Sequence, residues 1–196
     1  NREGLAIVSD DNLYKILDWK STRNRELSQS EINFTSTNHE DFQLIELVGT
    51  QNWKYHKGKE NISLRMYAGV FANNQSVSPR YNLRMDGQRG WYDYTFSNVF
   101  LERGTSHDFW QQQMNDNQGG FKTPTNVGQS NNWLLAFNLN ADLPLVLPIG
   151  IYSDIGTSST ESFMFNAGVR ITVLRDIVEV FLPALWSDSI EQAYSA

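Results

Sequence analysis

Hydrophobic and polar residues alternate along several segments in the second half of the chain. In 62–70, every second residue is apolar and those between are polar, aromatic or glycine: Ile62, Leu64, Met66, Ala68 and Val70 against Ser63, Arg65, Tyr67 and Gly69. The same period of two recurs in 133–141, 149–156 and 163–173 and, less cleanly, in 177–184. Successive side chains of a strand point to opposite faces of its sheet, so the pattern predicts β-strands with one apolar and one polar face.

The first 40 residues give a weaker pattern. Short apolar runs at 5–8 and 13–19 are interrupted by Asp, Asn and Ser, and the polar run 21–31 is most simply predicted to be a solvated loop. Further β-structure is expected at 32–35 and 42–55. We therefore divide the chain into a poorly defined loop and strand segment, 1–40, and a β-rich region, 41–196.

The predicted strands are joined by short and long connections in alternation. Short turns are expected around Gly58, at 144–148 and at 174–176, whereas 73–131, 157–162 and the tail from Ser187 are longer. Outer-membrane barrels have this asymmetry, with tight turns on one side of the membrane and longer loops on the other. A soluble β-sandwich would also alternate apolar and polar positions, so it remains the alternative. The connections favour the barrel, and Trp133 and Trp186 lie at the long-loop end, where an aromatic belt is expected.

Composition constrains the class of protein without deciding it. A mean hydropathy of −0.47 fits a soluble domain, and it also fits a barrel whose lumen-facing residues are polar. The formal net charge of −6 disfavours nucleic-acid binding. The absence of cysteine excludes a disulfide framework and a cysteine nucleophile. The start, Asn1-Arg2-Glu3-Gly4, has no Met, so we expect a processed or truncated piece of a longer protein.

Motifs of catalysis or metal binding are not found in the sequence. His39-Glu40 is not followed by the second histidine of the H-E-x-x-H zinc motif, and no G-x-S-x-G nucleophile motif occurs. We expect no catalytic residue, no metal and no cofactor in this chain.

The segment 73–131 is too long for an ordinary connection and is expected to have a function of its own. It contains Gly87-Gln88-Arg89-Gly90-Trp91, in which two glycines allow a sharp turn while Arg89 projects. The planar guanidinium of arginine suits a carboxylate partner, and Asp154, on the polar face of 149–156, is the candidate. A solvated arginine on a surface loop is the simpler alternative.

Residues 41–190, with these parts in this order, resemble the C-terminal half of the barrel of the Omp85 family, the bacterial surface antigens of the BamA and TamA class. That family carries a Val/Ile-Arg-Gly-Phe/Tyr tip on a long loop folded into the lumen. The run 88–91 departs from it, with Gln at the first position and Trp at the last. The family's aromatic-x-x-Asp-x-Gly pattern resembles 151–156, with Ile151 in place of the aromatic residue, and Asn140 stands where the family has glutamate.

The resemblance implies an all-β fold, a partial antiparallel transmembrane β-barrel made of the C-terminal strands of a sixteen-stranded barrel. It makes 61–72 the eleventh strand, leaves the final strand absent, and brings Arg89 towards Asp154 and Gly156, with Asn140 nearby. It also implies a bacterial outer-membrane protein that acts in protein insertion or translocation, with outer-membrane lipid and other assembly or secretion proteins as partners.

Two other functions stay open. The chain could anchor a surface or periplasmic enzyme, because some similar proteins of Bacteroidota are fused to a peptidase-like domain. A soluble β-sandwich could instead bind carbohydrate through aromatic residues of the insert: Trp91, Tyr92, Tyr94 and Trp110.

Overall fold

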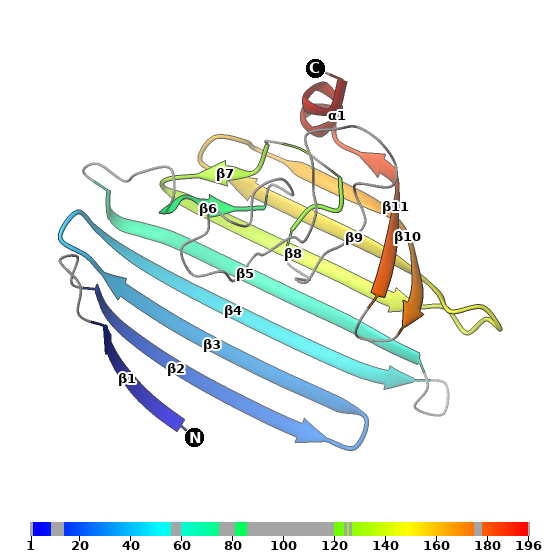
Figure 1. Cartoon of the computed structure of the whole chain (residues 1–196), viewed down its shortest axis with the longest axis horizontal. Helices are drawn as coiled ribbons and strands as arrows, with labels where there is room; N and C mark the ends of the chain where they lie inside the picture. Colours follow the sequence, from blue (N-terminus) through cyan, green and yellow to red (C-terminus); the bar gives the residue numbers. More distant parts are fainter. Residues whose placement is uncertain are drawn as a thin grey trace.

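The computed structural model describes residues 2–8, 14–55, 60–74, 81–85, 120–123, 125, 127–174 and 178–195. A nine-stranded sheet contains most of them (Figure 1), with the strands β1 (Arg2–Val8), β2 (Tyr14–Arg25), β3 (Ser28–Asn38), β4 (Phe42–Tyr55), β5 (Glu60–Asn74), β8 (Trp133–Asp142), β9 (Ile149–Ser158), β10 (Met164–Leu174) and β11 (Val178–Trp186). Two short strands, β6 (Leu83–Arg84) and β7 (Gln129–Ser130), pair with each other within the insert between β5 and β8. The helix α1 (Asp188–Ser195) follows β11.

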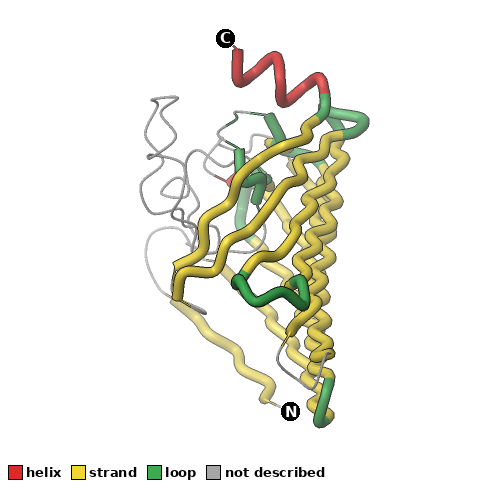
Figure 2. Tube along the Cα trace, turned by 90° about the vertical axis from the view of Figure 1, so that its right-hand side faces the viewer, coloured by secondary structure: helices red, strands yellow, loops and turns green. Residues whose placement is uncertain are grey.

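The large sheet is antiparallel throughout, and its strands lie side by side in chain order. This confirms the predicted all-β class. The strands β1 and β11 form its two edges, and no pairing among the described residues joins them, so the sheet is open. Figure 2 shows that the sheet is curved and that the described loop residues of the insert lie on its concave side.

The segments with a period of two are strands, as predicted: 62–70 lies in β5, 133–141 in β8, 149–156 in β9, most of 163–173 in β10, and the described part of 177–184 in β11. The prediction of a solvated loop at 21–31 is wrong. β2 and β3 run through it and turn only at Glu26 and Leu27, in unbroken register from the pair Lys15–Asn38 to the pair Arg25–Ser28. A ladder of backbone hydrogen bonds continues here although both faces carry polar side chains, because strand pairing does not itself require an apolar face.

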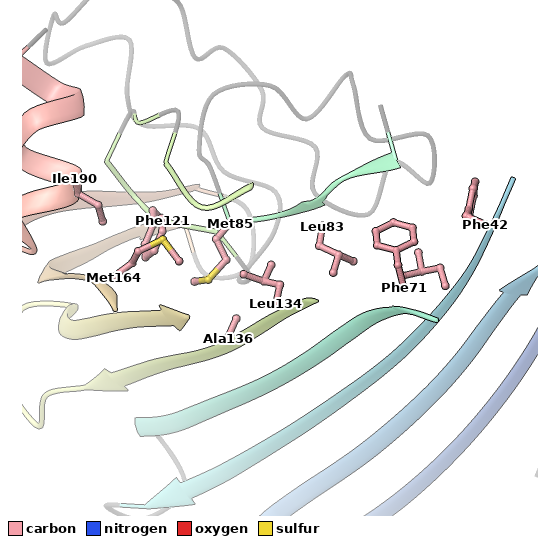
Figure 3. Packing of buried hydrophobic residues seen from close by; sticks show 10 residues of the cluster. Phe42, Phe71, Leu83, Met85, Phe121, Leu134, Ala136, Met164 and Ile190 are labelled. Carbon is pink, nitrogen blue, oxygen red and sulfur yellow. The ribbon is translucent and has the colours of Figure 1, made fainter. Parts of the chain in front are cut away.

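The buried apolar cluster lies on the concave side of the sheet (Figure 3). Leu134 and Ala136 of β8 and Met164 of β10 contribute from the sheet, while Met85 and Phe121 contribute from the insert. Other members come from the start of β4, the end of β5, β6 and α1: Phe42, Leu44, Phe71, Leu83 and Ile190. The insert is therefore packed against the sheet by burial of apolar surface.

The apolar positions of the alternating pattern lie on the opposite, convex face, where many of the large side chains are exposed. Met66, Phe137 and Ile155 form one row across β5, β8 and β9. Met66 exposes 53% of its surface, and Leu135, on the same face of β8, exposes 48%. In the middle of the sheet the polarity is thus inverted relative to that of a soluble sandwich, because buried polar residues such as Asn138 and Asp154 lie on one face and exposed apolar residues on the other.

Within the described ranges, no helix is both long and apolar enough to cross a membrane.

Candidate functional site

A row of polar residues crosses the concave face of the sheet beneath the insert. Arg65 of β5 pairs in register with Asn138 of β8, Asn138 pairs with Asp154 of β9, and Asp154 pairs with Asn166 of β10. The antiparallel register aligns these four positions, and the period of two turns all four side chains to the same face. Asn138, Asp154 and Asn166 are completely or almost completely buried, so their polar atoms need partners within the protein.

Asp154 is bound within this row by a neighbouring amide. The Nδ2 atom of Asn138 donates to Oδ1 of Asp154 at 2.8 Å, and Nη1 of Arg65 donates to Oδ1 of Asn138 at 3.2 Å. The Asn138 amide therefore links the guanidinium on β5 to the carboxylate on β9. A hydrogen bond to the charged form of Asp154 offsets part of the cost of burying its carboxylate.

Lys122 of the insert supplies a buried positive charge beside the same carboxylate. Its Nζ lies 3.6 Å from Oδ2 of Asp154, and each side chain exposes only 1% of its surface. The ammonium also donates to the carbonyl oxygen of Gly120 at 2.6 Å and lies 5.3 Å from the centroid of the Phe181 ring. The Lys122–Asp154 distance is longer than a good hydrogen bond, so this contact is an attraction between charges in a water-poor environment.

The residue after Lys122 is fastened to the next position of the row. The Nδ2 atom of Asn166 donates to Oγ1 of Thr123 at 2.7 Å, and the hydroxyl of Tyr152 donates to Oδ1 of Asn166 at 3.0 Å. Adjacent residues of the insert thus bind adjacent strands of the sheet. This arrangement fixes the position of the insert segment along the strands as well as its height above them.

Gly156 provides the space that the insert needs above β9. A Cβ atom at this position would lie 2.4 Å from Sδ of Met85, which is closer than any ordinary contact. The N–H of Met85 donates to the carbonyl of Gly128 at 2.7 Å, and the N–H of Phe121 donates to the carbonyl of Met85 at 2.9 Å. Gly128 has a φ of 99°, a conformation that glycine adopts at little cost. The described segments of the insert that contain Met85, Phe121 and Gly128 are thereby joined to one another above Gly156.

The sequence-predicted site residues are only partly covered by the described structure. Gly87, Gln88, Arg89, Gly90 and Trp91 all lie outside the described residues, so contact between the arginine and Asp154 stays a prediction. The aromatic residues suggested for carbohydrate, at 91, 92, 94 and 110, also lie outside them.

The site residues that the sequence predicts on the strands all lie on the concave face of the sheet: Asp154, Gly156 and Asn140. Asn140 pairs in register with Ser63 and Tyr152. It lies two residues along β8 from Asn138, which donates the hydrogen bond to the carboxylate of Asp154. The Oδ1 atom of Asn140 is buried and has no hydrogen-bond partner in the described part of the protein.

Sequence reasoning missed Lys122, Asn138 and Asn166 as members of the site. The alternation in 133–141 and 163–173 places both asparagines on the polar faces of their strands but does not distinguish them from other polar residues there. Lys122 lies between Phe121 and Thr123 in a segment without a period of two or of 3.6, so no pattern shows which way its side chain points. A lone lysine in a loop is usually solvated, so the sequence holds no signal that singles out Lys122.

A second cluster of charged side chains lies on the same face, nearer the short-turn edge, which is the end of the sheet where short connections such as 143–148 join the strands. Arg170 of β10 contacts the carboxylate of Asp142 at the end of β8, and its Nη1 lies 3.2 Å from Oε1 of Glu179 on β11. Gly150 lies beside the guanidinium and leaves room for it, since a Cβ there would lie 3.2 Å from Nη2. These ion pairs tie β8, β10 and β11 together where the strands end.

Among the described residues, His39, Glu40 and Asp41 are the one group whose donor atoms lie close enough to hold a metal ion. Both carboxylates are exposed in the β3–β4 turn, which is the ordinary state of acidic turn residues, so they give no reason to assign a metal centre.

No model of a known protein family matches this chain, and no curated protein or solved structure compared with it matches either.

Proposed function

We propose that this chain forms part of the wall of an outer-membrane β-barrel, with its concave face towards the lumen and its insert inside that lumen. The observation that carries the proposal is the inverted polarity of the sheet. Polar residues such as Asn138 and Asp154 are covered, whereas Met66, Leu135 and Phe137 are exposed on the convex face. Outward-facing strand residues of a transmembrane barrel contact lipid, which suits such side chains, whereas water does not.

The lengths of the strands support the same proposal. β8 and β9 each contain 10 residues, and a tilted transmembrane strand needs about 9–11. The strands β4 and β5 are longer, with 14 and 15 residues, so their ends would extend beyond the hydrocarbon layer.

We further propose that the barrel acts in insertion or translocation of proteins at the outer membrane, without bond chemistry. This step is supported by the sequence resemblance to the Omp85 family and by the placement of Asp154, which the resemblance singles out and which the insert contacts through Lys122. Such a barrel works with lipid and with other assembly or secretion proteins. The insert would brace the wall from inside while strands of a client protein form alongside it.

Two measurements on the purified full chain test the two parts of this proposal separately. For the barrel, the chain is refolded with and without detergent, and its mobility on gels is compared before and after heating. A folded form that appears only with detergent or vesicles is expected; a soluble, folded monomer without detergent would support the sandwich and overturn the barrel.

For insertion, vesicles that contain the chain are mixed with an unfolded outer-membrane client whose folding is followed by its gel shift. Faster client folding than in empty vesicles is the expected result. A chain that is embedded in the membrane but leaves client folding unchanged would favour the membrane-anchor function instead.

A further inference from the structure

The turn between β8 and β9 differs in chemistry from the other short connections at its edge of the sheet. Its sequence, from Leu143 to Pro148, contains no charged residue. Leu145, Val146 and Leu147 are all exposed, and Val146 is completely so. The other hairpin connections at this edge, at 26–27, 56–59 and 175–177, each contain at least one charged residue. Three consecutive exposed apolar residues in a turn indicate a contact with something apolar.

The backbone of this turn is held in place by hydrogen bonds. The N–H of Leu143 donates to the carbonyl of Ile149 at 2.8 Å, and the N–H of Ile149 donates to the carbonyl of Leu147 at 2.8 Å. The N–H of Thr172 on the next strand donates to the carbonyl of Pro148 at 2.9 Å. Prolines at 144 and 148 further restrict the backbone. The apolar side chains are therefore presented by a fixed turn that does not fold them away from solvent.

The apolar surface of the turn is continuous with the exposed convex face. Ile149 and Val173, which belong to the convex face, line the same pocket as Leu145 and Leu147. Two carboxylates, those of Glu60 and Asp142, line this pocket as well, and Asp142 is bound by the guanidinium of Arg170. At this edge of the sheet, the Glu60 carboxylate and the Asp142–Arg170 ion pair therefore border an apolar surface that extends past the ends of the strands.

We propose that the 143–148 turn is an interfacial membrane anchor that sits at the boundary between lipid headgroups and acyl chains. The inference rests on the proposed membrane location of the sheet and adds a specific contact at its short-turn edge. The composition favours lipid over a protein partner, because the residues that contribute most to protein binding are enriched in Trp, Tyr and Arg, whereas Leu and Val are under-represented among them. Three side chains are also too few for a stable protein interface, which buries on the order of 1,000 Å² or more.

Single cysteines test this inference cleanly, because the chain contains no cysteine of its own. V146C carries the probe in the turn, L135C on the convex face, and E26C in the β2–β3 turn at the same edge. Each variant is labelled with nitrobenzoxadiazole and reconstituted in phosphatidylcholine–phosphatidylglycerol vesicles. Fluorescence is quenched by lipids that carry a nitroxide near the headgroup or deep in the acyl chain, and separately by aqueous iodide.

The anchor predicts blue-shifted emission at V146C, strong quenching by the shallow nitroxide lipid, and loss of iodide quenching relative to E26C. The same aqueous response at V146C and E26C, with L135C quenched by the deep nitroxide lipid, would overturn the anchor and leave the proposed membrane location intact. Iodide quenching at L135C would instead overturn the proposed location itself. A V146C probe shielded from both nitroxide lipids and iodide would indicate a contact with a second copy of the chain and would reject the lipid anchor.

Discussion

Replacing Lys122 with Met removes the ammonium group beside Asp154 while keeping an unbranched apolar side chain in its place. The two charges are 3.6 Å apart and each side chain is 1% exposed, so solvent screens the attraction little. Coulomb's law gives about 4 to 5 kcal/mol at this distance for an effective dielectric constant of about 20. Removing one partner leaves a buried carboxylate uncompensated, which costs about 3 to 5 kcal/mol in comparable pairs. Since Asn138 still donates to Asp154, we expect about 3 kcal/mol for K122M.

The assay is a double-mutant cycle with K122M, D154N and the double variant. Each chain is refolded in detergent micelles, and its unfolding in urea is followed by tryptophan fluorescence and by gel mobility. Because the two side chains are in contact, the double variant is expected to lose less than the sum of the single losses, with a coupling energy of about 2 kcal/mol.

A matched control is provided by K20M. The Lys20–Glu31 ion pair is shorter, at 2.7 Å, but its side chains are 52% and 30% exposed. Exposed pairs contribute about 1 kcal/mol or less, so K20M should cost far less than K122M although its ions are closer. A coupling energy below about 0.5 kcal/mol, or equal losses in K20M and K122M, would refute the reasoning that burial makes the Lys122 contact important.

Two further predictions follow from the structure, and a third follows from the sequence resemblance. G156A should lose about 1 to 3 kcal/mol because its new methyl group meets Met85, and M85A in the same chain should restore part of the loss; no rescue would show that the insert does not press on Gly156. F137K should cost about 2 to 4 kcal/mol in vesicles, whereas T22K on the concave face should cost little; equal losses would contradict the assignment of faces. R89A should lower the stability of the heat-modifiable form if Arg89 braces the wall, and unchanged heat-modifiability with unchanged cell-surface function would count against that brace.

The strands with strict alternation were predictable because their two faces meet different environments. In β5, β8, β9 and β10 the concave face is covered by the insert and the convex face is apolar, so each position carries a clear preference. The hairpin of β2 and β3 was missed because polar residues such as Arg23 and Glu31 occupy its far end on both faces. Backbone pairing alone holds that end, and it leaves little trace in the side chains.

The residues of the candidate site that lie on the strands were predictable, whereas those in the insert were not. Asp154 and Gly156 lie on a regular strand, so the period-2 alternation shows which face of the sheet they occupy. The partner Lys122 lies in an irregular segment, where no periodicity reveals which way a side chain points. Its contact with Asp154 depends on the path of the chain across the concave face, which a single sequence does not encode in any local pattern.

The central claim, that the convex face meets lipid and the concave face does not, is tested most directly by a nitroxide scan of β8. Single cysteines at each position from 134 to 141 are spin-labelled in vesicles, and collision with oxygen is compared with collision with a water-soluble nickel complex. High oxygen and low nickel accessibility at 135, 137, 139 and 141, alternating with low oxygen accessibility at 134, 136, 138 and 140, is the predicted result. High nickel accessibility at 135 and 137 would contradict the account, since those residues would then face water.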